Sequence, residues 1–183
     1  MKRILGTSLL FAVLALQHVA AAPGPSIAKI CDDGISQVER EVVGLAEAMP
    51  ADKYSFAPTN GEFKGARTFG EQMSHIATVN YMVSSRVLGE KNPVDAGKNG
   101  NGPDSYKTKE AIVKFLKDSF VYARKAAHSL TADNYTEEVT TSPGHTATRA
   151  TLIAEPVWHS FDHYGQAVVY ARMNGIVPPA SRR

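Results

Sequence analysis

The chain is organised around residues 154–166, AEPVWHSFDHYGQ, which contain two histidines four positions apart, His159 and His163. In an α-helix this spacing places both imidazoles on one face, one turn apart. Two neutral imidazoles arranged in this way can share one transition-metal ion, which needs at least one further ligand from another part of the chain. We expect His75 to supply that ligand, so the sequence predicts a three-histidine metal site between two helices.

Four long segments have the apolar periodicity of amphipathic helices. They run from Ser26 to Met49, from Thr68 to Gly89, from Ser105 to Leu130, and from Thr146 or Thr148 to about Asn174. Thr68 and Glu71 have the spacing of a capping box, and Pro156 inside the last segment predicts a kink or a restart. Because no alternating strand pattern occurs and residues 131–145 are expected to form a loop, the sequence predicts an all-α four-helix bundle.

Residues 1–21 have the features of a secretory signal peptide. Lys2 and Arg3 precede an apolar run over residues 4–16, and small residues lead up to a cut expected after Ala21. The apolar run is shorter than the ~20 residues that a membrane-spanning helix needs. We therefore expect a soluble protein that is secreted or periplasmic, with one domain over residues 26–181.

The charge balance of the mature chain argues against two classes of partner. Two of the 20 Lys and Arg residues lie in the expected signal peptide, which leaves 18 basic residues against 18 acidic residues. Formal neutrality predicts no binding to nucleic acid and none to an anionic membrane surface. The single cysteine, Cys31, excludes an internal disulfide, and we interpret it as a small, half-buried helix residue.

Other catalytic and metal motifs fit the histidines less well. The residues between His159 and His163 do not form the His-Glu-x-x-His pattern, and no Glu-x-x-His pair of the di-iron type is present. Glu71 and Glu155 each precede a candidate ligand by four positions. We favour a capping role for Glu71 and leave Glu155 open as a general base or as a partner that fixes an imidazole tautomer.

Several residues near the candidate site are given roles other than metal ligation. Trp158 and Phe161 are expected to lie in the core, whereas Gln166, three positions after His163, is placed to line a pocket. A triad of Ser160, His159 and Asp162 is rejected because adjacent helical residues point in different directions. His128 and His145 have no partner at ligand spacing and are left out of the site.

Four stretches of the chain resemble the DinB-like superfamily. They are AMPADKYSFAPT at 48–59, FGEQMSHIA at 69–77, HSFDHYGQ at 159–166 and YARMNGIVPP at 170–179. The resemblance extends from about residue 27 to residue 181. It implies an up-down-down-up bundle in which His75, His159 and His163 hold a divalent metal, with zinc and nickel as the expected ions.

The resemblance also implies a choice of functions. Relatives include thiol-dependent S-transferases and metal-dependent hydrolases, and this chain departs from the cytosolic transferases in its export signal. The first hypothesis is an exported metal-dependent hydrolase or transferase of a small-molecule substrate, with Glu155 as candidate catalytic base. The alternative is a non-catalytic binding module with a structural or vestigial metal site, and a homodimer is left open.

Overall fold

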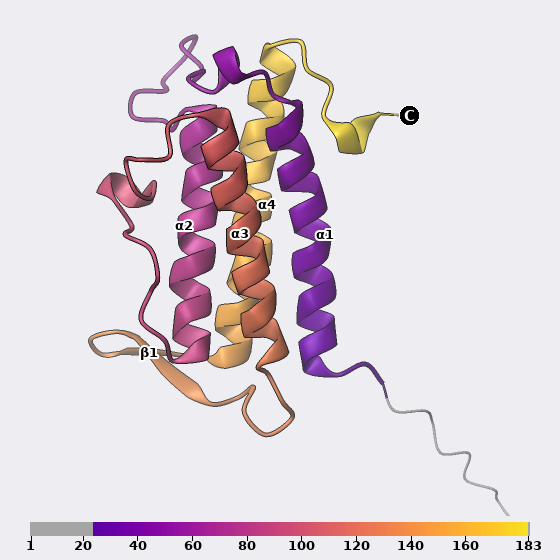
Figure 1. Cartoon of the computed structure of the whole chain (residues 1–183), viewed down its shortest axis with the longest axis vertical. Coiled ribbons are helices and arrows are strands. Elements are labelled where there is room, and N and C mark those ends of the chain that lie inside the picture. The colour runs from indigo at the N-terminus through magenta and orange to yellow at the C-terminus, as the bar shows by residue number, and fades with distance from the viewer. Residues whose placement is uncertain (1–23, 183) are drawn as a thin grey trace, which may run out of the picture.

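A computed structural model of the chain describes residues 24–182. The predicted signal peptide and its cleavage site therefore lie outside the described residues. Four helices form a bundle in which α1 and α2 each pack against both α3 and α4 (Figure 1). The helices are α1 (Ile27–Ala48), α2 (Phe69–Leu88), α3 (Lys109–His128) and α4 (Arg149–Met173).

Each of these helices begins after a hydroxyl residue whose side chain accepts a backbone hydrogen bond. The four N-caps are Ser26, Thr68, Thr108 and Thr148. The Thr68 cap has the reciprocal bond from Glu71, so the predicted capping box is confirmed. The predicted start of the third helix at Ser105 was four residues too early, because Thr108 supplies the side-chain acceptor that begins it.

A small antiparallel sheet replaces part of the predicted loop 131–145. Strands β1 (Glu138–Ser142) and β2 (His145–Thr148) form a hairpin that closes through a turn containing Gly144 at φ +77°. The loop prediction was wrong here because the strands are short and mostly exposed, so they carry little of the alternating apolar signal that marks a strand.

Helix α4 is continuous through Pro156, so the considered restart does not occur. Its buried positions include Ile153, Pro156 and His163, which face the other helices. Trp158 lies away from this face and is 57% exposed, so its predicted place in the core was wrong. Phe161 is partly buried and packs against the core, as expected.

Helix α2 buries six polar side chains. They are Gln72, Ser74, Thr78, Asn80, Ser84 and Ser85. Since buried polar groups need hydrogen-bond partners, two of these side chains, Gln72 and Asn80, are bonded to the neighbouring helices α4 and α3. Over residues 24–182, no helix combines the length and apolarity that a membrane crossing needs.

Candidate metal centre

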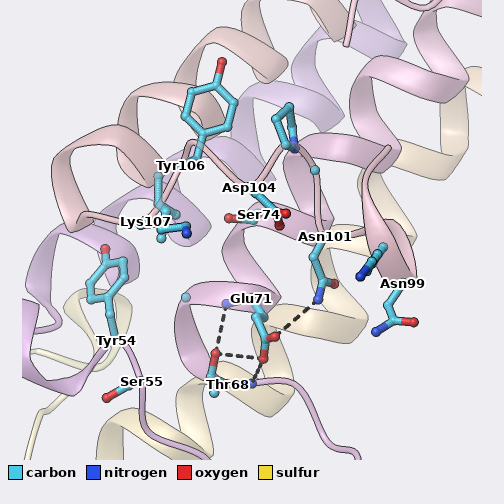
Figure 2. Close-up of a pocket in the computed structure, with 15 residues that line it drawn as sticks. Tyr54, Ser55, Thr68, Glu71, Ser74, Asn99, Asn101, Asp104, Tyr106 and Lys107 are labelled. Atoms are coloured by element: carbon cyan, nitrogen blue, oxygen red, sulfur yellow. Dashed lines mark hydrogen bonds between the residues drawn. The ribbon is translucent and has the colours of Figure 1, made fainter. Parts of the chain in front are cut away.

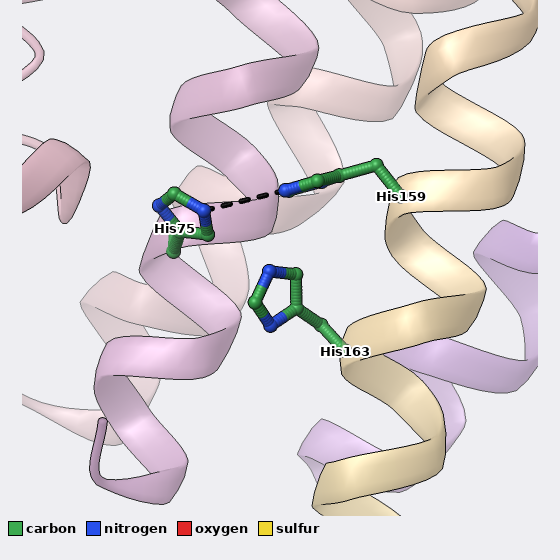
Figure 3. A group of neighbouring side chains, drawn as sticks. All are labelled: His75, His159 and His163. Atoms are coloured by element: carbon green, nitrogen blue, oxygen red, sulfur yellow. Dashed lines mark hydrogen bonds between the residues drawn. The ribbon is translucent and has the colours of Figure 1, made fainter. Parts of the chain in front are cut away.

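The structure brings together the three histidines that the sequence singled out. His75 comes from α2, and His159 and His163 come from successive turns of α4 (Figure 3). One ligand nitrogen of each ring lies within 4.8 Å of the others. His163 is buried, and the other two are half-buried. The arrangement follows from the packing of α2 against α4 and from the i, i+4 spacing on α4.

The separation of two ring nitrogens matches the edge of a metal coordination polyhedron. The Nε2 atoms of His75 and His159 are 3.3 Å apart. Two ligands at the usual Zn–N bond length in a tetrahedron lie about 3.3–3.4 Å apart, whereas adjacent ligands of an octahedron with the same bond length lie about 2.9 Å apart. The spacing of this pair is compatible with one edge of a tetrahedral site, and the third ring nitrogen lies within 4.8 Å of both.

The tautomer of His75 is set by a backbone carbonyl. The Nδ1 atom of His75 lies 2.7 Å from the carbonyl oxygen of Gly100, which can only accept. Nδ1 must therefore carry the hydrogen. In the neutral ring this leaves the lone pair on Nε2, the atom that faces His159 and the centre of the cluster.

The tautomer of His163 is set by a side chain that the sequence analysis missed. Nδ1 of His163 donates to the amide oxygen of Gln72, and the amide nitrogen of Gln72 donates to Oε1 of Gln166 at 3.0 Å. Gln166 in turn donates to Asp162. Gln72 lies three positions before His75, so its place on the same helical face was the available signal.

His159 differs from the other two ligand candidates. Its Nδ1 atom is buried and has no hydrogen-bond partner within residues 24–182. Glu155 lies one helical turn earlier and is half-buried. Burial raises the pKa of the Glu155 carboxyl, and the positive charge of Arg86 acts in the opposite direction.

All three imidazoles favour the neutral form that binds metal. Burial lowers the pKa of His75, and the hydrogen bond to Gly100 opposes this only in part. Burial, with help from the neighbouring rings, lowers the pKa of His159 to about 3. Burial and the charge of His75 lower the pKa of His163 to about 4, against the pull of Asp162. At neutral pH the cluster therefore presents three neutral rings.

The remaining candidates lie outside the cluster. Glu71 is occupied by the capping box, as favoured from the sequence. His128 approaches Asp32 at 3.3 Å, and His145 begins strand β2.

A cavity of ≈ 410 Å³ lies beside the first half of α2 (Figure 2). Its lining includes Ser74, Asp104 and Lys107 but none of the three histidines. One wall is formed by Lys98, Asn99, Asn101 and Gly102, which flank the Gly100 carbonyl that holds His75. The cavity and the histidine cluster therefore both adjoin the segment 98–102.

Comparisons with known proteins agree with this architecture. The family model described as the DinB superfamily matches residues 35–167. No curated protein matches. Three solved structures share the fold at 16% sequence identity. A DinB-like protein from Bacillus cereus has a TM-score of 0.66 and covers 82% of this chain and 95% of its own. The DinB-like protein YjoA from Bacillus subtilis has a TM-score of 0.61, with 84% and 99% covered. An uncharacterised Escherichia coli protein has a TM-score of 0.60, and the match covers 83% of this chain and 96% of that protein.

Proposed function

This chain belongs to the DinB superfamily, and we propose that it is an exported protein that binds one divalent transition-metal ion through His75, His159 and His163. One observation carries the proposal: three neutral imidazoles from two helices converge, with two Nε2 atoms at the spacing of a coordination edge. The bonds from Nδ1 of His75 and His163 support it, because ligand histidines characteristically donate their other ring nitrogen to an acceptor.

The donor set favours zinc or nickel among the common divalent ions. Imidazole nitrogens suit both metals, whereas magnesium and calcium prefer oxygen ligands. A tetrahedral zinc ion would be held by His75, His159 and His163 and would take one further ligand, and the 3.3 Å separation of two Nε2 atoms is compatible with this.

We propose hydrolysis or group transfer on a small-molecule substrate as the reaction. His75, His159 and His163 would hold the ion, which would supply Lewis-acid chemistry and lower the pKa of a coordinated water. Glu155 is the candidate proton acceptor, because its raised pKa brings the carboxylate closer to the basicity that proton transfer at neutral pH requires.

A non-catalytic binding module is the second candidate. It is favoured by the lining of the cavity, since the concave surface available to a ligand beside α2 does not include the three histidines. In this case the ion acts as a clip between α2 and α4, and its binding energy adds to the stability of the fold.

We also propose the up-down-down-up order of helix directions and export from the cell. The helix order is supported by residues 89–108, which run the length of the bundle between the end of α2 and the start of α3 (Figure 1). Export rests on the composition of residues 1–21.

A metal titration tests the proposed binding. The mature chain without a histidine tag, stripped with a chelator, should take up one zinc or nickel ion per chain by elemental analysis and calorimetry. The substitutions His159→Asn and His163→Asn should abolish uptake, and His128→Asn should leave it intact. Uptake that survives both ligand substitutions would refute the three-histidine site.

Turnover separates the two candidate functions. If the centre is catalytic, Glu155→Gln should lower kcat by about 10²–10⁴-fold on an ester, amide or thiol adduct while the metal content stays at one ion per chain. If metal instead raises Tm strongly and no substrate in a broad screen is converted, the ion is a structural clip.

A further inference from the structure

We propose that Arg67 is a positioning residue for the metal centre: its guanidinium binds both neighbours of Gly100, the backbone carbonyl of Asn99 and the side-chain amide of Asn101, and the carbonyl of Gly100 orients the ring of His75. The functional meaning of this clamp rests on the proposed metal binding. The contacts themselves lie entirely within the chain.

Two donors of one planar fork make the clamp. Nε of Arg67 donates to Oδ1 of Asn101 at 2.7 Å, and Nη2 donates to the carbonyl oxygen of Asn99 at 2.8 Å. The residue between these two acceptors is Gly100, whose carbonyl accepts from Nδ1 of His75 at 2.7 Å. Since the guanidinium is rigid and planar, it fixes both flanks of Gly100 at once.

The segment that Arg67 binds, residues 97–102, has little structure of its own to fix its position. Beyond one turn of 3₁₀ helix, η2 (Lys98–Gly100), it has no regular structure, and Asn99 adopts φ +59°, which non-glycine residues rarely do. Gly97, Gly100 and Gly102 also have positive φ. A chain with this many glycines loses much conformational entropy on ordering, so its position depends on the bonds that hold it.

Arg67 is well placed to transmit position from α2 to the segment. It immediately precedes Thr68, the N-cap of α2, and His75 lies about two turns further along the same helix. Asn101 is tied a second time, because its Nδ2 donates to Oε1 of Glu71 in the capping box at 3.4 Å. Arg67, His75 and Gly100 therefore form a closed structural loop anchored on one helix.

The charge of Arg67 acts against cation binding. It lies close enough to contribute to lowering the pKa of all three histidines. A guanidinium at that range also repels a dication. Positioning and charge thus predict opposite effects of removing Arg67, which makes the clamp testable.

The test compares the zinc dissociation constants of Arg67→Lys and Arg67→Met with that of the full mature chain, by competition with a chromophoric chelator. Lysine keeps the charge but loses the fork, and methionine loses both. The clamp predicts that Arg67→Lys binds zinc at least about 10-fold more weakly, and that Arg67→Met also binds more weakly, by a smaller factor because the repelling charge is gone. If Arg67 acts through its charge alone, Arg67→Met binds more tightly and Arg67→Lys is unchanged, and that result overturns the proposal.

Arg149→Lys is the matched control. Arg149 also joins two segments, through Glu137 and the carbonyl of Val87, but at the other end of α2. Its substitution should leave zinc affinity unchanged. Asn101→Ala, which removes one acceptor of the clamp, should reproduce the effect of Arg67→Lys and serves if an Arg67 variant does not fold.

A measurement without metal separates this proposal from the proposed function. Long-range ¹H–¹⁵N spectra of the metal-free protein should show His75 protonated on Nδ1, and the two Arg67 variants should show a mixture of tautomers. If the unsubstituted chain binds no zinc, the metal centre is refuted and the clamp is not. If His75 stays protonated on Nδ1 in both Arg67 variants, the clamp is refuted and the metal centre is not.

Discussion

Gln72 and His163 meet across the interface between α2 and α4, where the amide oxygen of Gln72 accepts the hydrogen of His163 Nδ1. Gln72 is only 2% exposed, so no water can easily replace it. Its own amide nitrogen is fixed by Gln166. The ring of His163 is therefore held in one tautomer and orientation before any ion binds.

Replacing Gln72 with leucine should weaken zinc binding. The substitution leaves the Nδ1 hydrogen of His163 buried without an acceptor, which should cost about 1–3 kcal/mol of folding stability. Loss of the orienting bond should lower metal affinity about 10–100-fold. Chemical denaturation of the metal-free protein and a zinc titration measure the two effects.

Asn80→Leu is the control for Gln72→Leu. Asn80 is another buried amide of α2, and it donates to Oγ of Ser119 rather than to a histidine. This variant should lose stability and keep its zinc affinity. Equal losses of affinity in both variants would show that general loosening of α2, not the bond to His163, controls the site.

The metal-free protein should lose stability as the pH falls from about 6.5 towards 4. The histidines of the unfolded chain take up protons near their ordinary pKa of about 6.5. In the folded state the pKa of His159 is about 3 and that of His163 about 4. The unfolded state therefore binds more protons throughout this window, and acid favours it.

Unfolding midpoints measured every half pH unit in the presence of a chelator check this dependence. The double variant His159→Gln, His163→Gln should show a flatter profile between pH 6.5 and 4. An identical slope in the variant would assign the acid sensitivity to other groups. Zinc should also shift the apparent acid limit downwards, because it competes with protons for the same nitrogens.

Gly100→Ala should perturb both stability and metal affinity. Gly100 has φ +71°, which costs an L-residue about 1–2 kcal/mol, and an added Cβ would lie 3.3 Å from Nδ1 of His75. The alanine should therefore push on the ring as well as strain the backbone. Zinc titration and thermal unfolding give the two quantities.

Gly89→Ala provides the comparison for Gly100→Ala. Gly89 ends α2 at φ +68°, and no atom lies within 4 Å of an added Cβ. It should show the strain without the change in affinity. A zinc affinity that falls equally in the two variants would mean that backbone strain alone, rather than contact with His75, disturbs the site.

The parts of the fold with periodic or capped sequence could be predicted. The four helices follow from apolar spacing, and the starts of the first, second and fourth follow from Ser26, Thr68 and Thr148. His159 and His163 share a face because of their spacing alone. The addition of His75 needed only a second helix with a histidine beside its apolar stripe.

The supporting groups of the site could not be predicted in this way. Gly100 contacts His75 through a backbone carbonyl, and any residue type has one. Arg67 reaches Asn99 and Asn101 across more than 30 positions of sequence, through a segment without periodicity. The hairpin and the exposure of Trp158 were missed because both depend on how the end and the outer face of the bundle are packed.

Trp158 is the single tryptophan of the chain, and its exposed ring lies 6.1 Å, centroid to centroid, from that of His159. The tryptophan fluorescence of the protein therefore comes from an indole beside one of the three ligand candidates. A dication arriving at His159 changes the electric field at the indole. The unlabelled protein therefore carries its own optical probe, in which the intrinsic emission reports metal loading without an added dye.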